Sequence, residues 1–148
     1  MLLARGLEDR IVVRQSIGTQ GTHMGLTHAQ VTLENPFRKR RIELPALVDS
    51  GCMHLTIPDS VAKQLGFDPT EFGTLNVRLA DGTQRNVPRV GPLRIHYAGR
   101  WADLTALVFG DEPLMGALAL EALDLSLNPT TQSITLNLTS PALGYRDG

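Results

Sequence analysis

The sequence predicts an all-β fold, a small closed or nearly closed β-barrel with one or two short helices. Many runs of strand length alternate with turns that contain Gly, Pro or Asn. Each of two short helical patterns follows an apolar strand and a glycine. A chain of 148 residues without a linker, a low-complexity segment or a strict repeat is expected to form one main domain. Small barrels combine many short strands with few helices in this way.

The first half of the chain predicts three strands, at residues 11–17, 27–34 and 42–48. The second of these alternates polar and apolar side chains, which is typical of a half-buried strand. Asn35-Pro36 opens the turn that follows, and residues 38–41 place four positive charges in it. Because a charge run is usually a solvated surface, we interpret this turn as a hairpin tip; a phosphate-binding patch is the alternative.

The second half of the chain predicts a short helix and a hairpin, followed by further strands. The helix is expected to begin at Asp59-Ser60 and to end near Gly66. Asp81-Gly82 separates two extended runs, which is among the strongest local signals of a β-hairpin. The remaining expected elements are strands at residues 75–79, 84–90, 93–97 and 102–109, an apolar strand end and helix at 114–123, and a last strand at 133–138.

Charge and cysteine content restrict the classes of function and compartment. The net charge is −1, from 14 basic and 15 acidic residues, which argues against a general binder of nucleic acid or membrane surfaces. Cys52 is the single cysteine, so no intrachain disulfide can form, and this fits a reducing compartment. The N-terminal residues lack the apolar core of a signal peptide, and we expect a cytoplasmic protein.

The most informative segment places Asp49-Ser50-Gly51 between two apolar runs, residues 46–48 and 55–57. Most Asp-Ser-Gly triplets are surface turns, because Asp and Ser bond their own backbone. Here the flanking runs have the pattern of buried β-strands. A carboxylate inside an apolar sheet is costly unless it is paired, hydrogen-bonded or used in function. Asp49 is therefore the first candidate for a functional side chain.

Three features occur in a particular order: the apolar strand with Asp49-Ser50-Gly51, the Asp81-Gly82 hairpin, and Leu114-Met115-Gly116 ahead of a helix. This order resembles the retropepsin-like aspartic proteases, specifically the single-domain bacterial relatives of the retroviral enzymes. The resemblance implies a small closed barrel of the retropepsin type at residues 24–140. Residues 1–23 are then an N-terminal extension that could supply an extra strand, and residues 141–148 are expected to form a loose tail.

The resemblance also implies a role for each motif. Asp49 would be catalytic, Ser50 would bond across a dimer to brace the two active loops, and Gly51 would admit the substrate backbone. The hairpin around Asp81 and Gly82 would be the flap that covers a peptide substrate. Gly116 would pack behind the catalytic loop.

The chemistry of this family requires two aspartates, and the chain has one such motif. The resemblance therefore implies a homodimeric aspartic endopeptidase without a cofactor, in which one Asp49 from each subunit activates water. We expect a peptide or protein substrate, and neither nucleic acid nor a membrane as partner.

Three positions depart from the family pattern. Cys52 stands where Ala is usual, and we expect it to serve packing. Met53 and His54 stand where active members often have a polar or acidic residue that grips the substrate backbone. We therefore assign Met53 and His54 to substrate binding, with a changed pocket. The alternative is a catalytically inactive module of the same fold that dimerises or binds peptides.

Other catalytic or metal sites have weaker support in the sequence. Cys52 and His54 lie two apart and could share one face of a strand, but neighbours on one strand rarely meet in hydrogen-bonding geometry. Ser50 lacks the glycine-flanked elbow of serine hydrolases. The four histidines have no spacing typical of zinc ligands, so we expect no metal site.

Overall fold

The computed structural model describes residues 10–14, 27–79, 81–128, 130–131 and 133–137. Its strands are β1 (Arg10–Arg14), β2 (Thr27–Asn35), β3 (Arg40–Val48), β4 (Leu55–Ile57), β5 (Thr74–Arg78), β6 (Gln84–Tyr97), β7 (Arg100–Val108), β8 (Leu114–Met115), β9 (Leu125–Asn128) and β10 (Ser133–Asn137). Its helices are α1 (Asp59–Gln64) and α2 (Ala117–Leu123).

Six strands form a closed barrel, which confirms the predicted fold class. The main sheet has the order β2-β3-β8-β4-β7-β6-β5, and β6 also pairs with β2. This second pairing closes the barrel, with Leu33 opposite Ile95. Inward side chains follow the expected alternation along β2, where Ala29, Val31 and Leu33 are buried. The result is an aliphatic core beneath a polar outer face.

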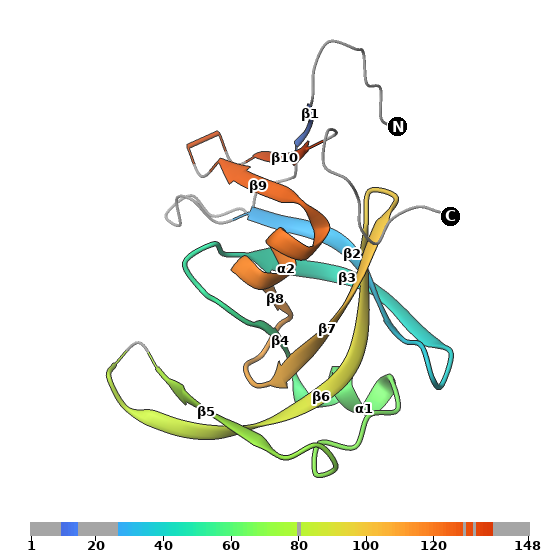
Figure 1. Cartoon of the computed structure of the whole chain (residues 1–148), viewed down its shortest axis with the longest axis vertical. Helices are drawn as coiled ribbons and strands as arrows, with labels where there is room; N and C mark the ends of the chain where they lie inside the picture. Colours follow the sequence, from blue (N-terminus) through green and yellow to red (C-terminus); the bar gives the residue numbers. More distant parts are fainter. Residues whose placement is uncertain (1–9, 15–26, 80, 129, 132, 138–148) are drawn as a thin grey trace.

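Two further features extend from opposite ends of the barrel (Figure 1). The hairpin of β5 and β6 reaches out at one end, while β9 and β10 lie at the other. There, β1, β10 and β9 form a separate three-stranded antiparallel sheet. Strand β1 contains the first part of the strand predicted at residues 11–17; residues 15–17 and the predicted C-terminal tail lie outside the described residues.

The structure changes the expected strand list in two places. The predicted strands 84–90 and 93–97 are one continuous strand, β6, with a register shift between Val90 and Leu93. Because β6 pairs with β7 on both sides of this irregularity, Gly91-Pro92 interrupts the ladder without ending the strand. Strand β9 was not predicted, although Leu125 is buried and Ser126 exposed, as in a half-buried strand.

The two helices lie at the expected positions. Helix α1 buries Val61 and Ala62 and is followed by the buried Leu65. Helix α2 follows β8 through Gly116 and buries Ala119, Leu120 and Leu123. In the described part of the chain, neither helix has the length and apolarity that crossing a membrane requires.

Candidate active site

Asp49 follows directly on β3 and begins the loop of residues 49–54 that leads into β4. Strand β3 pairs in parallel with β8, where Val48 lies opposite Met115. The Asp49 amide continues this pairing by donating to the Met115 oxygen at 3.0 Å. The flanking strands are buried as predicted, but Asp49 itself is exposed, because the chain leaves the sheet after Val48. The expected position of its carboxylate inside an apolar sheet is therefore wrong.

The Asp49 carboxylate shapes the turn that follows it. Its Oδ1 atom accepts a hydrogen bond of 2.9 Å from the Gly51 amide, and its backbone oxygen accepts one of 3.1 Å from the Cys52 amide. Such a self-bonded turn holds the aspartate at a defined orientation. Ser50 and Gly51 are exposed on the same turn. Asp49, Ser50 and Gly51, which the sequence analysis groups in one motif, therefore lie on a single hydrogen-bonded turn.

The N-terminal end of α2 supports this loop from behind. The amides of Ala117 and Leu118 donate to the backbone oxygens of Cys52 and Met53, at 2.7 and 3.0 Å. These amides begin a helix and would otherwise lack acceptors. Gly116 immediately precedes them and packs against the loop backbone. The structure thus places Gly116 behind the loop, where the sequence analysis expects it.

A cavity of about 620 Å³ opens between this loop and the β5–β6 hairpin. Asp49, Gly51, Met53 and His54 line it, together with residues of β4, β5, β6 and the end of β7. Met53 is 59% exposed within it. The cavity thus joins most of the residues that the sequence analysis selects around Asp49.

The cavity also includes residues that the sequence analysis missed. The hairpin contributes Asn76, Val77, Arg78 and Leu79, and Phe109 lies just beyond β7. The predicted hairpin was the available signal for these residues, because the resemblance already placed the hairpin next to the substrate. Ser50 and the hairpin-tip pair predicted to bind substrate, Asp81 and Gly82, do not line the cavity.

The hairpin tip is a tight hydrogen-bonded turn. The Asp81 Oδ1 atom accepts bonds from the Thr83 hydroxyl at 2.7 Å and the Thr83 amide at 2.9 Å. The Gly82 amide donates to the Leu79 oxygen at 2.9 Å, and Gly82 has a φ of 91°, which favours glycine. The hydrogen bond from the Thr83 hydroxyl lowers the pKa of Asp81 below its ordinary value of 3.8, and the bond from the Thr83 amide adds a smaller effect in the same direction.

The described residues form neither of the two alternative sites, a Cys–His catalytic pair or a metal site. No hydrogen bond joins Cys52 and His54, and the segment between them is a loop, so they do not share a strand face. Within the same described ranges, no cluster of three or more His, Cys, Asp or Glu side chains is placed to hold a metal ion.

Comparisons with known proteins agree with this arrangement. A family model described as aspartyl protease matches residues 29–134. Among solved structures, the fold is similar to that of a retropepsin-like aspartic protease from Rickettsia conorii, with a TM-score of 0.58 and 16% sequence identity. That alignment covers 86% of this chain and 89% of the Rickettsia chain. A comparison with curated proteins finds no match.

Proposed function

The chain belongs to the aspartyl protease family, and on this basis we propose that it is a homodimeric aspartic endopeptidase. Its substrates would be peptides or proteins, bound in an extended form beneath the β5–β6 hairpin. The observation that carries the proposal is the position of Asp49. Its exposed carboxylate lines a cavity that the hairpin also lines, on a loop held by its own turn and by α2.

A homodimer follows from the number of motifs. The chain has one Asp-Ser-Gly triplet, whereas hydrolysis by this chemistry uses two carboxylates. An isologous two-fold interface presents the same residue from each protomer, so it would bring two Asp49 side chains together. The exposure of Asp49 in the single chain fits this assembly, because a second protomer would supply the missing half of the site.

The proposed mechanism needs only the two carboxylates and water. Two carboxylates about 3 Å apart do not both remain ionised, so they share one proton. The ionised carboxylate takes a proton from water, and the protonated one donates to the substrate carbonyl oxygen. In the same step the water oxygen attacks the carbonyl carbon, which gives a gem-diol that is not bonded to the enzyme. The carboxyl that received the proton then passes it to the amide nitrogen, and the other carboxylate takes a proton from the gem-diol. The carbon–nitrogen bond breaks, the amine and the carboxylic acid leave, and the pair again shares one proton.

The other predicted site residues support binding. Ser50 would brace the loop across the dimer, and Gly51 would allow the substrate backbone to approach. Met53 and His54 would contact substrate side chains from the cavity wall. Asp81 and Gly82 lie at the hairpin tip, outside the cavity lining, so their role would be to shape and close the flap.

The test compares wild type with Asp49→Asn on a peptide library and a denatured protein. We expect the substitution to reduce cleavage by about 10²–10⁴-fold, because it removes the acid–base pair. Asp111→Asn is the matched control, since Asp111 is exposed and outside the cavity. Equal cleavage by wild type and Asp49→Asn would overturn the assignment. Molecular mass in solution at several concentrations tests the dimer, and a strict monomer would contradict it.

The second candidate function is an inactive module of the same fold that dimerises or binds peptides. The apolar, 59% exposed Met53 favours it, because it lines the cavity where a polar group that grips a substrate backbone is expected. This candidate predicts no cleavage between about pH 3 and 7, while a peptide still binds in calorimetry. Cleavage that depends on Asp49 would exclude it.

A further inference from the structure

We infer that Arg78 makes the cavity selective for peptides that carry a carboxylate side chain, Asp or Glu, at one position near the bond to be cleaved. The inference rests on the proposed function, because it concerns the substrate of the same cavity. It adds an electrostatic selection to the largely apolar walls around Asp49. Three observations support it: the position of Arg78, the absence of a carboxylate partner for its guanidinium among the described residues, and the charges of the other residues that line the cavity.

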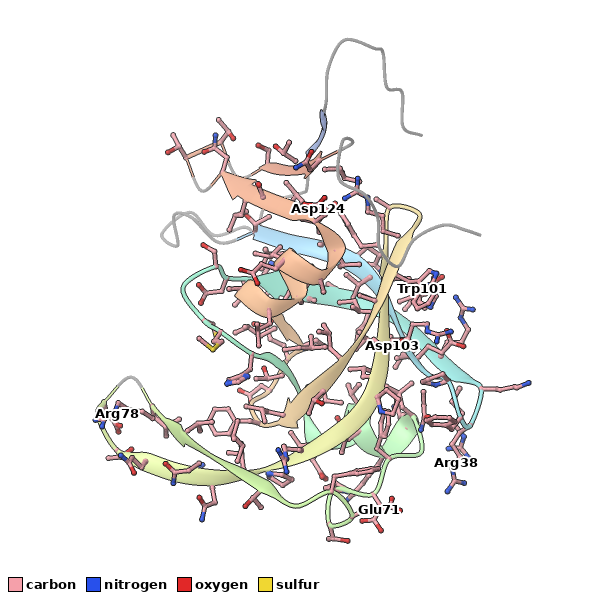
Figure 2. The ribbon with its side chains drawn as sticks, viewed as in Figure 1. Arg38, Glu71, Arg78, Trp101, Asp103 and Asp124 are labelled. Carbon is pink, nitrogen blue, oxygen red and sulfur yellow. The ribbon has the colours of Figure 1, made fainter. Side chains whose placement is uncertain are left out.

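Arg78 is the last residue of β5 and lies opposite Gln84 of β6, in the strand pair next to the hairpin turn. It is exposed and lines the cavity together with Asp49. Figure 2 shows it near the end of the hairpin that reaches out from the barrel. A peptide between the hairpin and the loop of residues 49–54 would therefore pass within reach of this long side chain.

The guanidinium of Arg78 has no carboxylate partner among the described residues. Its one hydrogen bond there runs from Nη1 to the Gly82 oxygen at 3.5 Å, which is long for such a contact. Asp81 is the nearest acid in sequence, but its Oδ1 atom accepts the hydrogen bonds of the Thr83 hydroxyl and amide, and no ion pair joins it to Arg78 among the described residues. Most of the donors of Arg78 therefore remain available to a ligand.

The cavity offers no other permanent positive charge. Apart from Arg78, Asp49 and His54, the lining side chains are uncharged. Arg85 of the same hairpin instead lies over the Phe109 ring, 5.6 Å from its centre, and is not part of the lining. A guanidinium covered by a bound peptide loses water, and a carboxylate that binds its two donors side by side compensates for that loss. A neutral side chain at the same position would leave the charge unpaired.

The experiment uses pairs of fluorogenic peptides that differ only by Glu or Gln at one position, scanned through the residues flanking the cleaved bond. At about pH 5.5 the Glu side chain is ionised, since its ordinary pKa is about 4.3. We expect wild type to show about threefold to tenfold higher kcat/KM for the Glu peptide at one position. The preference should disappear in Arg78→Gln and below about pH 4, where Glu becomes neutral.

Arg38→Gln is the matched control, because it removes the same charge from the β2–β3 turn, on the other side of the molecule from Arg78 (Figure 2). It should keep the Glu preference. Equal kcat/KM for each pair in wild type would overturn the inference, as would an Arg78→Gln variant that loses the same factor on both peptides of a pair.

A binding measurement separates this inference from the proposed function. Fluorescence anisotropy can compare the same Glu and Gln peptides on Asp49→Asn protein, which does not need to cleave them. If no cleavage occurs in wild type but the Glu peptide binds more tightly through Arg78, the proposed function fails and the selectivity holds. If Asp49-dependent cleavage occurs without a Glu preference in either assay, the selectivity fails and the proposed function holds.

Discussion

The backbone oxygen of Cys52 lies 2.6 Å from the point that a Cβ atom on Gly116 would occupy. The His54 oxygen and the Met53 carbonyl carbon would lie 2.7 and 2.8 Å from the same point. These are backbone atoms, which cannot move aside as a flexible side chain can. The absence of a side chain at Gly116 therefore allows α2 to approach the loop that carries Asp49, and Ala117 to donate to Cys52.

Gly116→Ala should displace this loop or make the protein less stable against unfolding. We expect a loss of about 3 kcal/mol in the free energy of unfolding, because the methyl group overpacks against backbone and weakens two hydrogen bonds. Urea denaturation measures it. Gly110→Ala is the control: Gly110 has a φ of 87° but no atom within 4 Å of an added Cβ, so only a conformational cost of about 1–2 kcal/mol is expected. Equal losses in both variants would contradict the steric explanation.

Arg100→Lys should weaken the attachment of the C-terminal strands. The buried Arg100 donates from Nη1 to the oxygens of Leu123 and Asp124, at 2.7 and 2.8 Å, and from Nη2 to the Asn137 oxygen at 2.7 Å. One lysine ammonium does not reproduce this planar fork. We expect a loss of about 3 kcal/mol in the free energy of unfolding, because one buried and two partly buried carbonyls lose their donors.

Arg94→Lys provides the matched control for that loss. Arg94 pairs with Asp103 at 2.7 Å, but about a third of each side chain is exposed. A pair of this kind contributes about 1 kcal/mol or less. If the two substitutions cost the same, the three carbonyl contacts of Arg100 would not be the reason for the loss.

The hairpin turn should remain intact in mild acid. Since the pKa of Asp81 is lowered in the folded state, its ionised form stabilises the turn above its ordinary pKa of 3.8, and this contribution is lost as the pH falls through the lower folded value. Thr83→Val removes the hydroxyl bond and should move the pKa of Asp81 back toward 3.8. Titration of the carboxyl carbon by NMR measures the change.

Thr70→Val gives an internal control for this titration. Thr70 donates its hydroxyl and its amide to Asp68 at 2.7 and 2.9 Å, and these bonds lower the pKa of Asp68 in the same way. Thr70→Val should raise the pKa of Asp68 alone, and Thr83→Val that of Asp81 alone. A shift of both carboxyls in either variant would indicate a general change in the fold.

Mixing of subunits should reveal whether each active site uses two chains. With equal amounts of wild type and Asp49→Asn, random pairing should leave about half of the activity that the same amount of wild type has alone, because heterodimers carry one Asp49. Mixing with the same amount of Asp111→Asn chains should instead double the activity, because every dimer then carries two Asp49 side chains. If the activity of the wild-type chains stays the same after Asp49→Asn chains are added, one chain acts alone.

Local sequence determined much of the fold. The alternation of residues 27–34 predicted β2, Asp81-Gly82 predicted the hairpin, and Asp59 to Gly66 bounded α1. Each of these signals depends on neighbours a few positions apart. The order of Asp49-Ser50-Gly51, the hairpin and Gly116 also indicated the family that the model match at residues 29–134 supports. The order of motifs indicates a family because it is visible in the sequence and requires no knowledge of how far apart the motifs lie in the folded chain.

Only the tertiary structure decided the features that depend on distant pairing. Strand β6 continues through Gly91-Pro92 because β7 pairs with it on both sides of the irregularity. Asp49 is exposed because the chain leaves the sheet after Val48, and Arg78 lines its cavity because the hairpin and the loop of residues 49–54 border the same cavity. Local periodicity states which face a side chain occupies, but it does not state which distant segment lies opposite that face.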